Sequence, residues 1–174
     1  FETPTRVRAS GGLGPMGYGL PAAMGVQVAH PDALVIDIAG EASFMMNMQE
    51  LSTLAQYNLP VKMFIINNEW MGMVRQWQEL FYDERFSKNH FGSEITNYKM
   101  WAETVGCVGF RVDSPEEVVP TIQKANEIND RPVVIDFRTQ AEENVYPMVP
   151  AGASNSEVLV DPSQRDADSS GETS

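Results

Sequence analysis

Two apolar segments of this sequence end in residues that carry oxygen ligands, and this pair of endings limits the possible folds more than any other feature. Residues 33–38 lead into Gly40-Glu41-Ala42-Ser43, and residues 61–66 lead into Asn67-Asn68. The 24 residues 43–66 lie between Ala42 and Asn67, which is room for a helix that connects two parallel strands. We therefore expect a carboxylate and an amide at the carboxyl ends of two strands, where both can bind one Mg²⁺.

The turn Gly40–Ser43 consists mostly of small residues and precedes a predicted helix over 43–58. The first N–H groups of a helix have no partner within the helix, so they can bind a phosphate group. The spacing thus favours a metal ion next to a diphosphate. The motif alone leaves one alternative open, a plain strand–turn–helix with an incidental acid and two loop asparagines.

The rest of the sequence alternates between strand and helix patterns. A glycine-rich stretch over 10–19 indicates backbone that approaches a ligand closely or adopts positive φ. Helices are predicted over 20–30, 43–58, 71–82, 98–105 and 115–128, and strands over 33–38, 61–66, 107–112 and 132–137. Ser114 and Glu117 form a capping box before the last helix. The alternation predicts a doubly wound α/β fold with a mostly parallel sheet, helices on both faces, and ligands beyond the carboxyl ends of the strands.

The periodicity stops near Gln140, which predicts a domain over 1–139 and a C-terminal segment over 140–174 that is disordered after Asp161. The net charge of −12 argues against nucleic acid as a partner. No apolar run is long enough to span a membrane, and no signal peptide pattern precedes the first motif. Because Phe1 is not a start methionine, we expect a fragment of a longer protein.

Four further residues are candidates for chemistry, and each also has a structural interpretation. Cys107 lies in an apolar run and is expected to be a small core residue. His30 and His90 have no partner at a metal-ligand spacing, so both are interpreted as structural or solvated. Arg75 fits either a solvated charge or the rim of an active site.

Several segments resemble acetohydroxyacid synthase, also called acetolactate synthase. They are the glycine-rich stretch 10–23, residues 67–78 with Gly72-Met73-Val74 followed by Trp77, and Pro147-Met148-Val149-Pro150. The spacing of 40–68 also resembles the general thiamine diphosphate motif. Glu41 stands where that motif usually has aspartate, and it keeps the charge and the oxygen ligand but adds one methylene. The resemblance covers about residues 8–160 and identifies the chain with the C-terminal cofactor-binding domain of the catalytic subunit.

The resemblance implies that three residues bind Mg²⁺. These are the carboxylate of Glu41, the side-chain amide of Asn68 and the backbone carbonyl of Trp70. The diphosphate would be held by small residues at the same turn, namely Gly40, Ala42 and Ser43.

The resemblance also implies contacts with the rest of the cofactor and with the substrate. Gly14 and Met16 would contact the aminopyrimidine of thiamine diphosphate, and the bulk of Met16 would hold the cofactor in a bent shape. Met73 would contact the cofactor and line the substrate channel together with Trp77. Trp77 would help to select the second 2-keto acid. Because Met73 and Trp77 also fit an amphipathic helix, the pattern alone favours an ordinary core role for these two residues.

The activity implied is a thiamine diphosphate-dependent transfer in branched-chain amino acid biosynthesis. Pyruvate would be decarboxylated and joined to a second pyruvate or to 2-oxobutyrate. The family also implies FAD, a homodimer or tetramer, and a regulatory small subunit. The glutamate that activates the cofactor and most of the FAD site would belong to other domains, so the fragment alone is expected to be inactive. The location would be cytoplasmic in a bacterium and a plastid or mitochondrion in a eukaryote.

Two alternatives remain at this stage. The first is another thiamine diphosphate enzyme, such as a 2-keto acid oxidase, decarboxylase or carboligase. Such an enzyme shares the pattern over 40–68 but does not need Gly72-Met73-Val74 followed by Trp77. The second is a non-catalytic module that keeps the fold and has lost metal binding. Metal-dependent cofactor binding separates the second alternative from the enzymes.

Overall fold

The computed structural model describes residues 6–92 and 96–162. The chain divides into two compact units, one formed by residues 1–71 and 90–141 and the other by residues 72–89 and 142–174. The disorder expected after Asp161 concerns residues that, from 163 onward, lie outside the described ones. None of the described helices has the length and apolar character needed to cross a bilayer.

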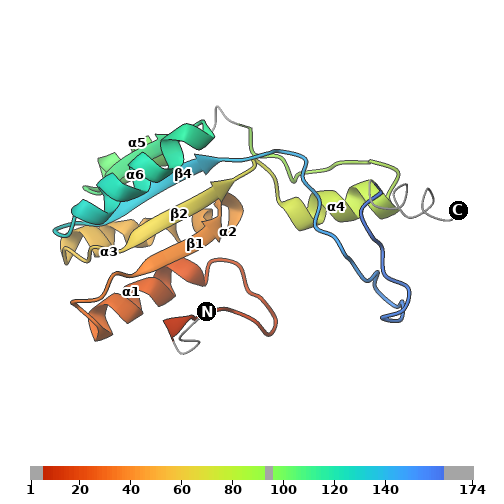
Figure 1. Ribbon diagram of the computed structural model, residues 1–174, viewed down its shortest axis with the longest axis horizontal. Coiled ribbons are helices and arrows are strands. Elements are labelled where there is room, and N and C mark those ends of the chain that lie inside the picture. Colours follow the sequence, from red (N-terminus) through yellow and green to blue (C-terminus); the bar gives the residue numbers. More distant parts are fainter. Residues whose placement is uncertain (1–5, 93–95, 163–174) are drawn as a thin grey trace, which may run out of the picture. The chain divides into compact units, whose positions relative to one another are not determined.

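The first unit is a parallel sheet with helices on both faces (Figure 1). Its strands are β1 (Ile36–Gly40), β2 (Lys62–Asn67), β3 (Val108–Val112) and β4 (Val133–Arg138), in the spatial order β1-β2-β4-β3. Its helices are α1 (Gly19–Ala29), α2 (Glu41–Met45), the 3₁₀ turn η2 (Met48–Glu50), α3 (Leu51–Gln56), α5 (Tyr98–Thr104) and α6 (Pro115–Glu127). The predicted fold class is confirmed.

Two apolar clusters on opposite faces of the sheet hold these layers together. On one face, Met63 and Ile65 of β2 and Val134 of β4 pack with α1, α2, α3 and α5. On the other face, β4 contributes Val133, Ile135 and Phe137, which pack with α6. Because successive side chains of a strand point to opposite faces, β4 supplies both clusters, and four of its six residues are apolar.

The expected single helix over 43–58 is wrong, because that segment forms α2, η2 and α3 in succession. The break occurs at Asn47, whose φ of −135° lies outside the helical region. The Asn47 Nδ2 donates a hydrogen bond of 2.6 Å to the carbonyl oxygen of Gly17. This long-range contact gives the asparagine a partner that a continuous helix would not offer. Phe44 of α2 and Leu51 of α3 are nevertheless both buried in the core.

Other local predictions are confirmed. Ser114 and Glu117 form the expected capping box at the start of α6. Cys107 is buried, and burial raises the pKa of its thiol to about 11. At neutral pH this cysteine is a protonated core residue, as its apolar surroundings in the sequence predicted.

The second unit contains α4 (Gly72–Phe81) and the C-terminal segment. Gln76 is 1% exposed and makes two hydrogen bonds with the backbone of Val145, one as donor and one as acceptor. Arg75 forms an ion pair of 2.8 Å with Glu79 and donates a hydrogen bond to Asn144. The sequence did not decide whether Arg75 is a solvated charge or part of an active-site rim. In the structure Arg75 is buried and connects α4 to the C-terminal segment.

Candidate cofactor and metal site

The two predicted motif halves follow the ends of adjacent parallel strands. β1 ends at Gly40 and β2 ends at Asn67, and Gly40 lies opposite Ile66 in the register of the pair. Glu41 and Asn68 are the next residues on each chain segment. Since the carboxyl ends of parallel strands share one edge of the sheet, the structure brings the two motif halves together as the spacing predicted.

Glu41 is the first residue of α2 and is only 2% exposed. Burial raises the pKa of its carboxyl group, whereas the backbone N–H groups of Asn68 and Trp70 and the positive charge of Arg138 lower it. These influences show that the carboxylate faces the loop that follows β2. Its Oε1 atom has no hydrogen-bond partner among the described residues. A buried carboxylate oxygen without a donor is costly unless a cation or another partner satisfies it.

The two asparagines have different partners. The Asn67 Nδ2 donates a hydrogen bond of 2.8 Å to Asp136 on β4, a buried contact. The Asn67 Oδ1 accepts from the N–H of Glu69, and the Asn68 Oδ1 accepts from the N–H of Trp70. Asn67 is therefore tied to the sheet, whereas Asn68 is half-buried and belongs to the loop that faces Glu41.

The residues at this edge fit a magnesium ion. No cluster of three His, Cys, Asp or Glu side chains that could hold a metal occurs within residues 6–92 and 96–162. A site made of one carboxylate, one amide and one backbone carbonyl would not count as such a cluster. Mg²⁺ accepts such oxygen donors and takes its remaining ligands from water and phosphate. The unsatisfied Oε1 of Glu41 agrees with this donor set.

The glycine-rich stretch is fastened to the start of α2. The N–H of Gly17 donates a hydrogen bond of 3.0 Å to the Ser43 Oγ, and the carbonyl oxygen of Gly17 accepts from Asn47. Gly17 has a φ of +83°, and a Cβ there would lie 2.7 Å from the Asn47 Nδ2. Glycine is thus required at this position. Gly14 also has a positive φ, of 66°, and Met16 lies in the same stretch and is 45% exposed.

The other predicted site residues lie in two places, at the start of α2 and on α4. Gly40 ends β1 with an extended backbone, and Ala42 is buried in the first turn of α2. Met73 and Trp77 lie on α4 in the second unit. Met73 is 48% exposed, and the ring of Trp77 lies 5.1 Å from that of Phe81. The substrate-channel role of both residues stays a prediction, and the exposure of Met73 does not agree with an ordinary core role.

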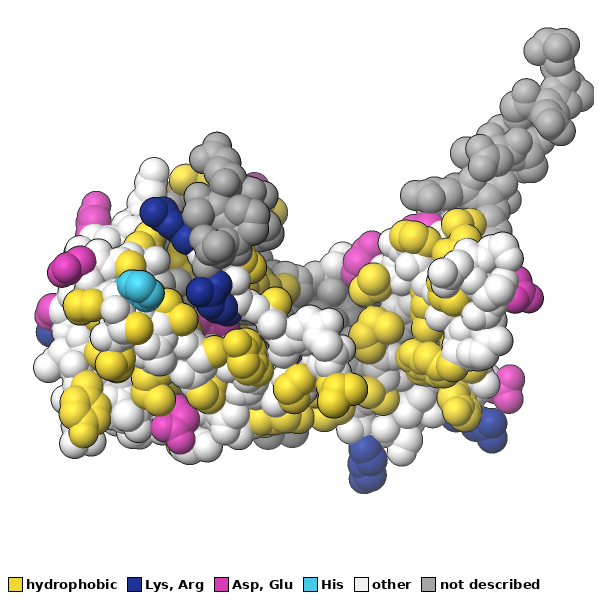
Figure 2. All heavy atoms as spheres, turned by 90° about the horizontal axis from the view of Figure 1, so that it is seen from below, with side chains coloured by type: hydrophobic (Ala, Val, Ile, Leu, Met, Phe, Trp, Pro, Cys, Tyr) yellow, Lys and Arg dark blue, Asp and Glu magenta, His cyan; other side chains and the backbone are white. Residues whose placement is uncertain are grey.

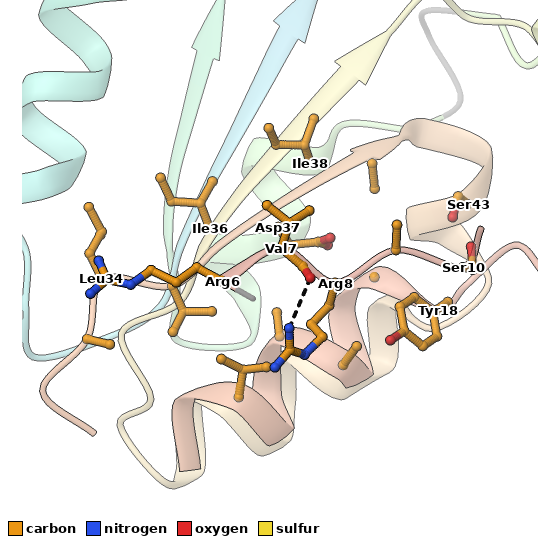
Figure 3. Close-up of a pocket in the computed structure, with 18 of the residues that line it drawn as sticks. Arg6, Val7, Arg8, Ser10, Tyr18, Leu34, Ile36, Asp37, Ile38 and Ser43 are labelled. Atoms are coloured by element: carbon orange, nitrogen blue, oxygen red, sulfur yellow. Dashed lines mark hydrogen bonds between the residues drawn. The ribbon is translucent and has the colours of Figure 1, made fainter. Parts of the chain in front are cut away.

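A cavity of about 1300 Å³ runs beside β1 in the first unit (Figure 3). Its walls come from the segment 6–10, α1 and β1, and Ser43 lies at one end. Leu34, Ile36 and Ile38 are exposed along this edge, and Figure 2 shows hydrophobic side chains interspersed with a few charged ones on the underside of the molecule. The edge of β1 away from β2 pairs with no other strand in the part of the chain that the structure describes.

Asp37 is the buried carboxylate of this cavity. It is 7% exposed, and its Oδ2 has no hydrogen-bond partner among the described residues. Burial raises the pKa of Asp37 to about 6. A Cβ at Gly19, the first residue of α1, would overlap the Asp37 Oδ1, so the glycine makes room for the acid.

Three polar residues around the site were not predicted from the sequence. Asp136 accepts a hydrogen bond from the side chain of Asn67, and the side chain of Asn47 donates a hydrogen bond to the backbone of Gly17. Tyr98 of α5 is 2% exposed, and burial together with the charges of Glu41 and Asp136 raises the pKa of its phenol. Only Asp136 had a local signal, as the one charged residue inside the apolar segment 132–137.

These strand ends define a cofactor-binding α/β domain, and comparison with known proteins identifies its family. The family model described as "Thiamine pyrophosphate enzyme, C-terminal TPP binding domain" matches residues 1–137. The chain belongs to this family. The predicted resemblance to thiamine diphosphate enzymes is thereby confirmed.

The narrower resemblance is confirmed by curated relatives. The chain is 49% identical over 161 residues to the acetolactate synthase large subunit of Corynebacterium glutamicum, which covers 91% of this chain and 26% of the relative. It is 48% identical over 151 residues to that of Porphyra purpurea, covering 87% of this chain and 25% of the relative. The chain therefore spans about a quarter of the length of these relatives.

A solved structure supports the fold. The thiamine diphosphate-dependent 4-hydroxybenzoylformate decarboxylase of Rhodococcus jostii RHA1 matches with a TM-score of 0.68 and 29% identity. The match covers 74% of this chain and 24% of the decarboxylase.

Proposed function

We propose that this chain is the cofactor-binding C-terminal part of an acetolactate synthase, a thiamine diphosphate-dependent transferase. The structural observation that supports the proposal is the buried carboxylate of Glu41, with an unsatisfied oxygen, facing the loop of Asn68 and Trp70. The relatives favour acetolactate synthase over other enzymes of the family. The substrates would be pyruvate and a second 2-keto acid, either pyruvate or 2-oxobutyrate.

In this proposal the residues of the chain bind and orient the cofactor. Glu41, the Asn68 amide and the Trp70 carbonyl would hold Mg²⁺, and the turn of Gly40, Ala42 and Ser43 would hold the diphosphate. Thiamine diphosphate, when bound, supplies the electron sink for decarboxylation of a 2-keto acid. The chain contributes position and electrostatics, while the activating glutamate and most of an FAD site would come from the rest of a dimeric or tetrameric enzyme with a regulatory subunit.

The test is product analysis with the full-length protein, thiamine diphosphate, Mg²⁺ and pyruvate. Acetolactate is the expected product, and removal of Mg²⁺ with a chelator should abolish its formation until Mg²⁺ is restored. Aldehyde without acetolactate would instead identify a decarboxylase, as in the structural relative. Absence of both turnover and cofactor binding would indicate a non-catalytic module. Residues 1–174 alone should bind the cofactor weakly and form no acetolactate.

Substitution of Trp77 by leucine tests the proposed selection of the second substrate. A large flat side chain in an acceptor site can favour the additional methyl group of 2-oxobutyrate by about 1–3 kcal/mol. We expect Trp77→Leu to lower the preference for 2-oxobutyrate over pyruvate by about tenfold, with pyruvate decarboxylation largely retained. Competition assays with both keto acids give this ratio. Tyr82→Leu, which removes an exposed aromatic ring just after α4, is the control, and an unchanged ratio in the Trp77 variant contradicts the assignment.

A further inference from the structure

The end of β2 and the loop that follows it are attached to the end of β4 at three points. The Asn67 Nδ2 donates to Asp136, and the N–H of Thr139 donates a hydrogen bond of 3.0 Å to the carbonyl oxygen of Asn67. The third attachment is an ion pair between the Arg138 guanidinium and the Glu69 carboxylate. Arg138 is the last residue of β4 and lies opposite Asn67 in the parallel register. The end of β4 thus holds the residues on either side of Asn68.

Glu69 has a backbone conformation that needs such support. Its φ of +68° is in the left-handed region, which costs energy for any residue with a Cβ. The other four non-glycine residues with positive φ in the described part of the chain, Asn58, Asp83, Glu84 and Lys88, are all exposed. Glu69 is half-buried and lies directly between Asn68 and Trp70, the two residues assigned to the metal.

The neighbours of Glu69 restrain its backbone and its side chain together. Its N–H donates to the Asn67 Oδ1, and its carbonyl oxygen accepts a hydrogen bond of 2.8 Å from Phe91. Its carboxylate lies between Arg138 and the Nε2 of His90, which is 3.8 Å away. The strained residue is therefore restrained on each of its polar groups, and Arg138 provides the direct ionic contact.

An electrostatic effect on the metal does not explain why an arginine occurs at position 138. Its positively charged guanidinium lies near Glu41, a carboxylate assigned to a cation. A cation next to a metal site opposes the binding of a second cation. An arginine at this place therefore needs another role, and its ion pair with Glu69 can fix that carboxylate in one orientation.

We propose that Arg138 is a positioning residue for the metal site: by holding Glu69 in its left-handed conformation, it fixes the directions of the Asn68 side chain and the Trp70 carbonyl. This inference rests on the proposed function, because it takes Asn68 and Trp70 as Mg²⁺ ligands. Arg138 itself does not contact the metal or the cofactor. Residues that orient metal ligands commonly change metal affinity when they are replaced.

The experiment measures Mn²⁺ affinity of the full-length protein in excess thiamine diphosphate, using the electron paramagnetic resonance signal of free Mn²⁺. Arg138→Leu should weaken Mn²⁺ binding by about tenfold, whereas Arg138→Lys, which keeps the ion pair, should recover most of the affinity. Arg131→Leu is the matched control, since Arg131 is exposed and pairs with Asp130 at the opposite end of β4. Hydrogen exchange without metal should show faster exchange at residues 68–70 in Arg138→Leu only.

The direction in which Arg138→Leu changes the Mn²⁺ affinity distinguishes a positioning role from a simple effect of charge. Removal of a positive charge near Glu41 would, by electrostatics alone, tighten Mn²⁺ binding. Tighter or unchanged binding by Arg138→Leu overturns the inference, as does an equal loss of affinity in Arg138→Lys. Glu41→Gln is measured alongside. If Glu41→Gln weakens binding and Arg138→Leu does not, only the positioning role fails; if Glu41→Gln has no effect, the proposed metal site fails and the inference fails with it.

Discussion

Substitution of Glu41 by glutamine should weaken Mg²⁺-dependent binding of thiamine diphosphate by about one to two orders of magnitude. The substitution keeps the shape of the side chain but removes the charge that would face the metal, and a charge-assisted contact contributes about 1.5–3 kcal/mol. Burial of Glu41 strengthens the expectation, because solvent does not replace the lost ligand. Titration of the full-length protein with Mg²⁺ at fixed cofactor concentration, followed by calorimetry, measures the effect.

Glu127→Gln provides a matched control, since it makes the same chemical change at an exposed site at the end of α6. The control should bind cofactor as the unmodified protein does. Equal cofactor affinity of the Glu41 variant across the whole Mg²⁺ titration would rule out the assignment of Glu41 to the metal.

Asp37→Asn should change the pH dependence of stability by an amount that is large for one side chain. Burial raises the pKa of Asp37 from 3.8 to about 6, so the folded state holds this proton more tightly than the unfolded state does. Ionisation of this buried carboxylate lowers the free energy of unfolding. The loss is absent below about pH 4, grows between about pH 4 and pH 6, and is complete above pH 6. The shift corresponds to about 3 kcal/mol.

We expect Asp37→Asn to be more stable than the unmodified chain at pH 7.5, by up to about 3 kcal/mol, and to lose this advantage by about pH 4. Denaturant unfolding at several pH values measures the difference. Asp32→Asn, which removes one charge from the exposed loop before β1, controls for net charge. A stability difference between Asp37→Asn and the unmodified chain that does not vary with pH would refute the explanation.

The part of the site that the sequence predicted depends on local patterns. Glu41 and Asn68 were placed together because each follows an apolar strand, and parallel strands bring such ends to one edge. The capping box of Ser114 and Glu117 was also predictable, because both partners lie within one turn. In each case the residues that determine the structure are close in sequence or follow a repeated pattern.

The features that the sequence did not reveal depend on contacts between distant residues. Asn47 ends α2 because of a carbonyl 30 residues away at Gly17. Asp136 and Arg138 reach Asn67 and Glu69 only because β4 inserts between β2 and β3, and this strand order cannot be read from a strand's own composition. Arg75 is structural because Asn144, 69 positions later, lies beside it. Local propensities contain no information about such partners.

Because Asn67 and Asn68 have different partners, the length of β2 cannot vary freely in evolution. The Asn67 side chain donates to Asp136 inside the sheet, and Asn68 belongs to the half-buried loop that follows. A deletion of one residue within β2 would move Asn68 to the sheet position of Asn67, and an insertion would move Asn67 to the loop position of Asn68. Insertions in the turn 57–60, before the strand, leave these positions intact. Related proteins should therefore differ in the number of residues between the acid and the paired asparagines through this turn, with the length from Lys62 to Asn68 held constant.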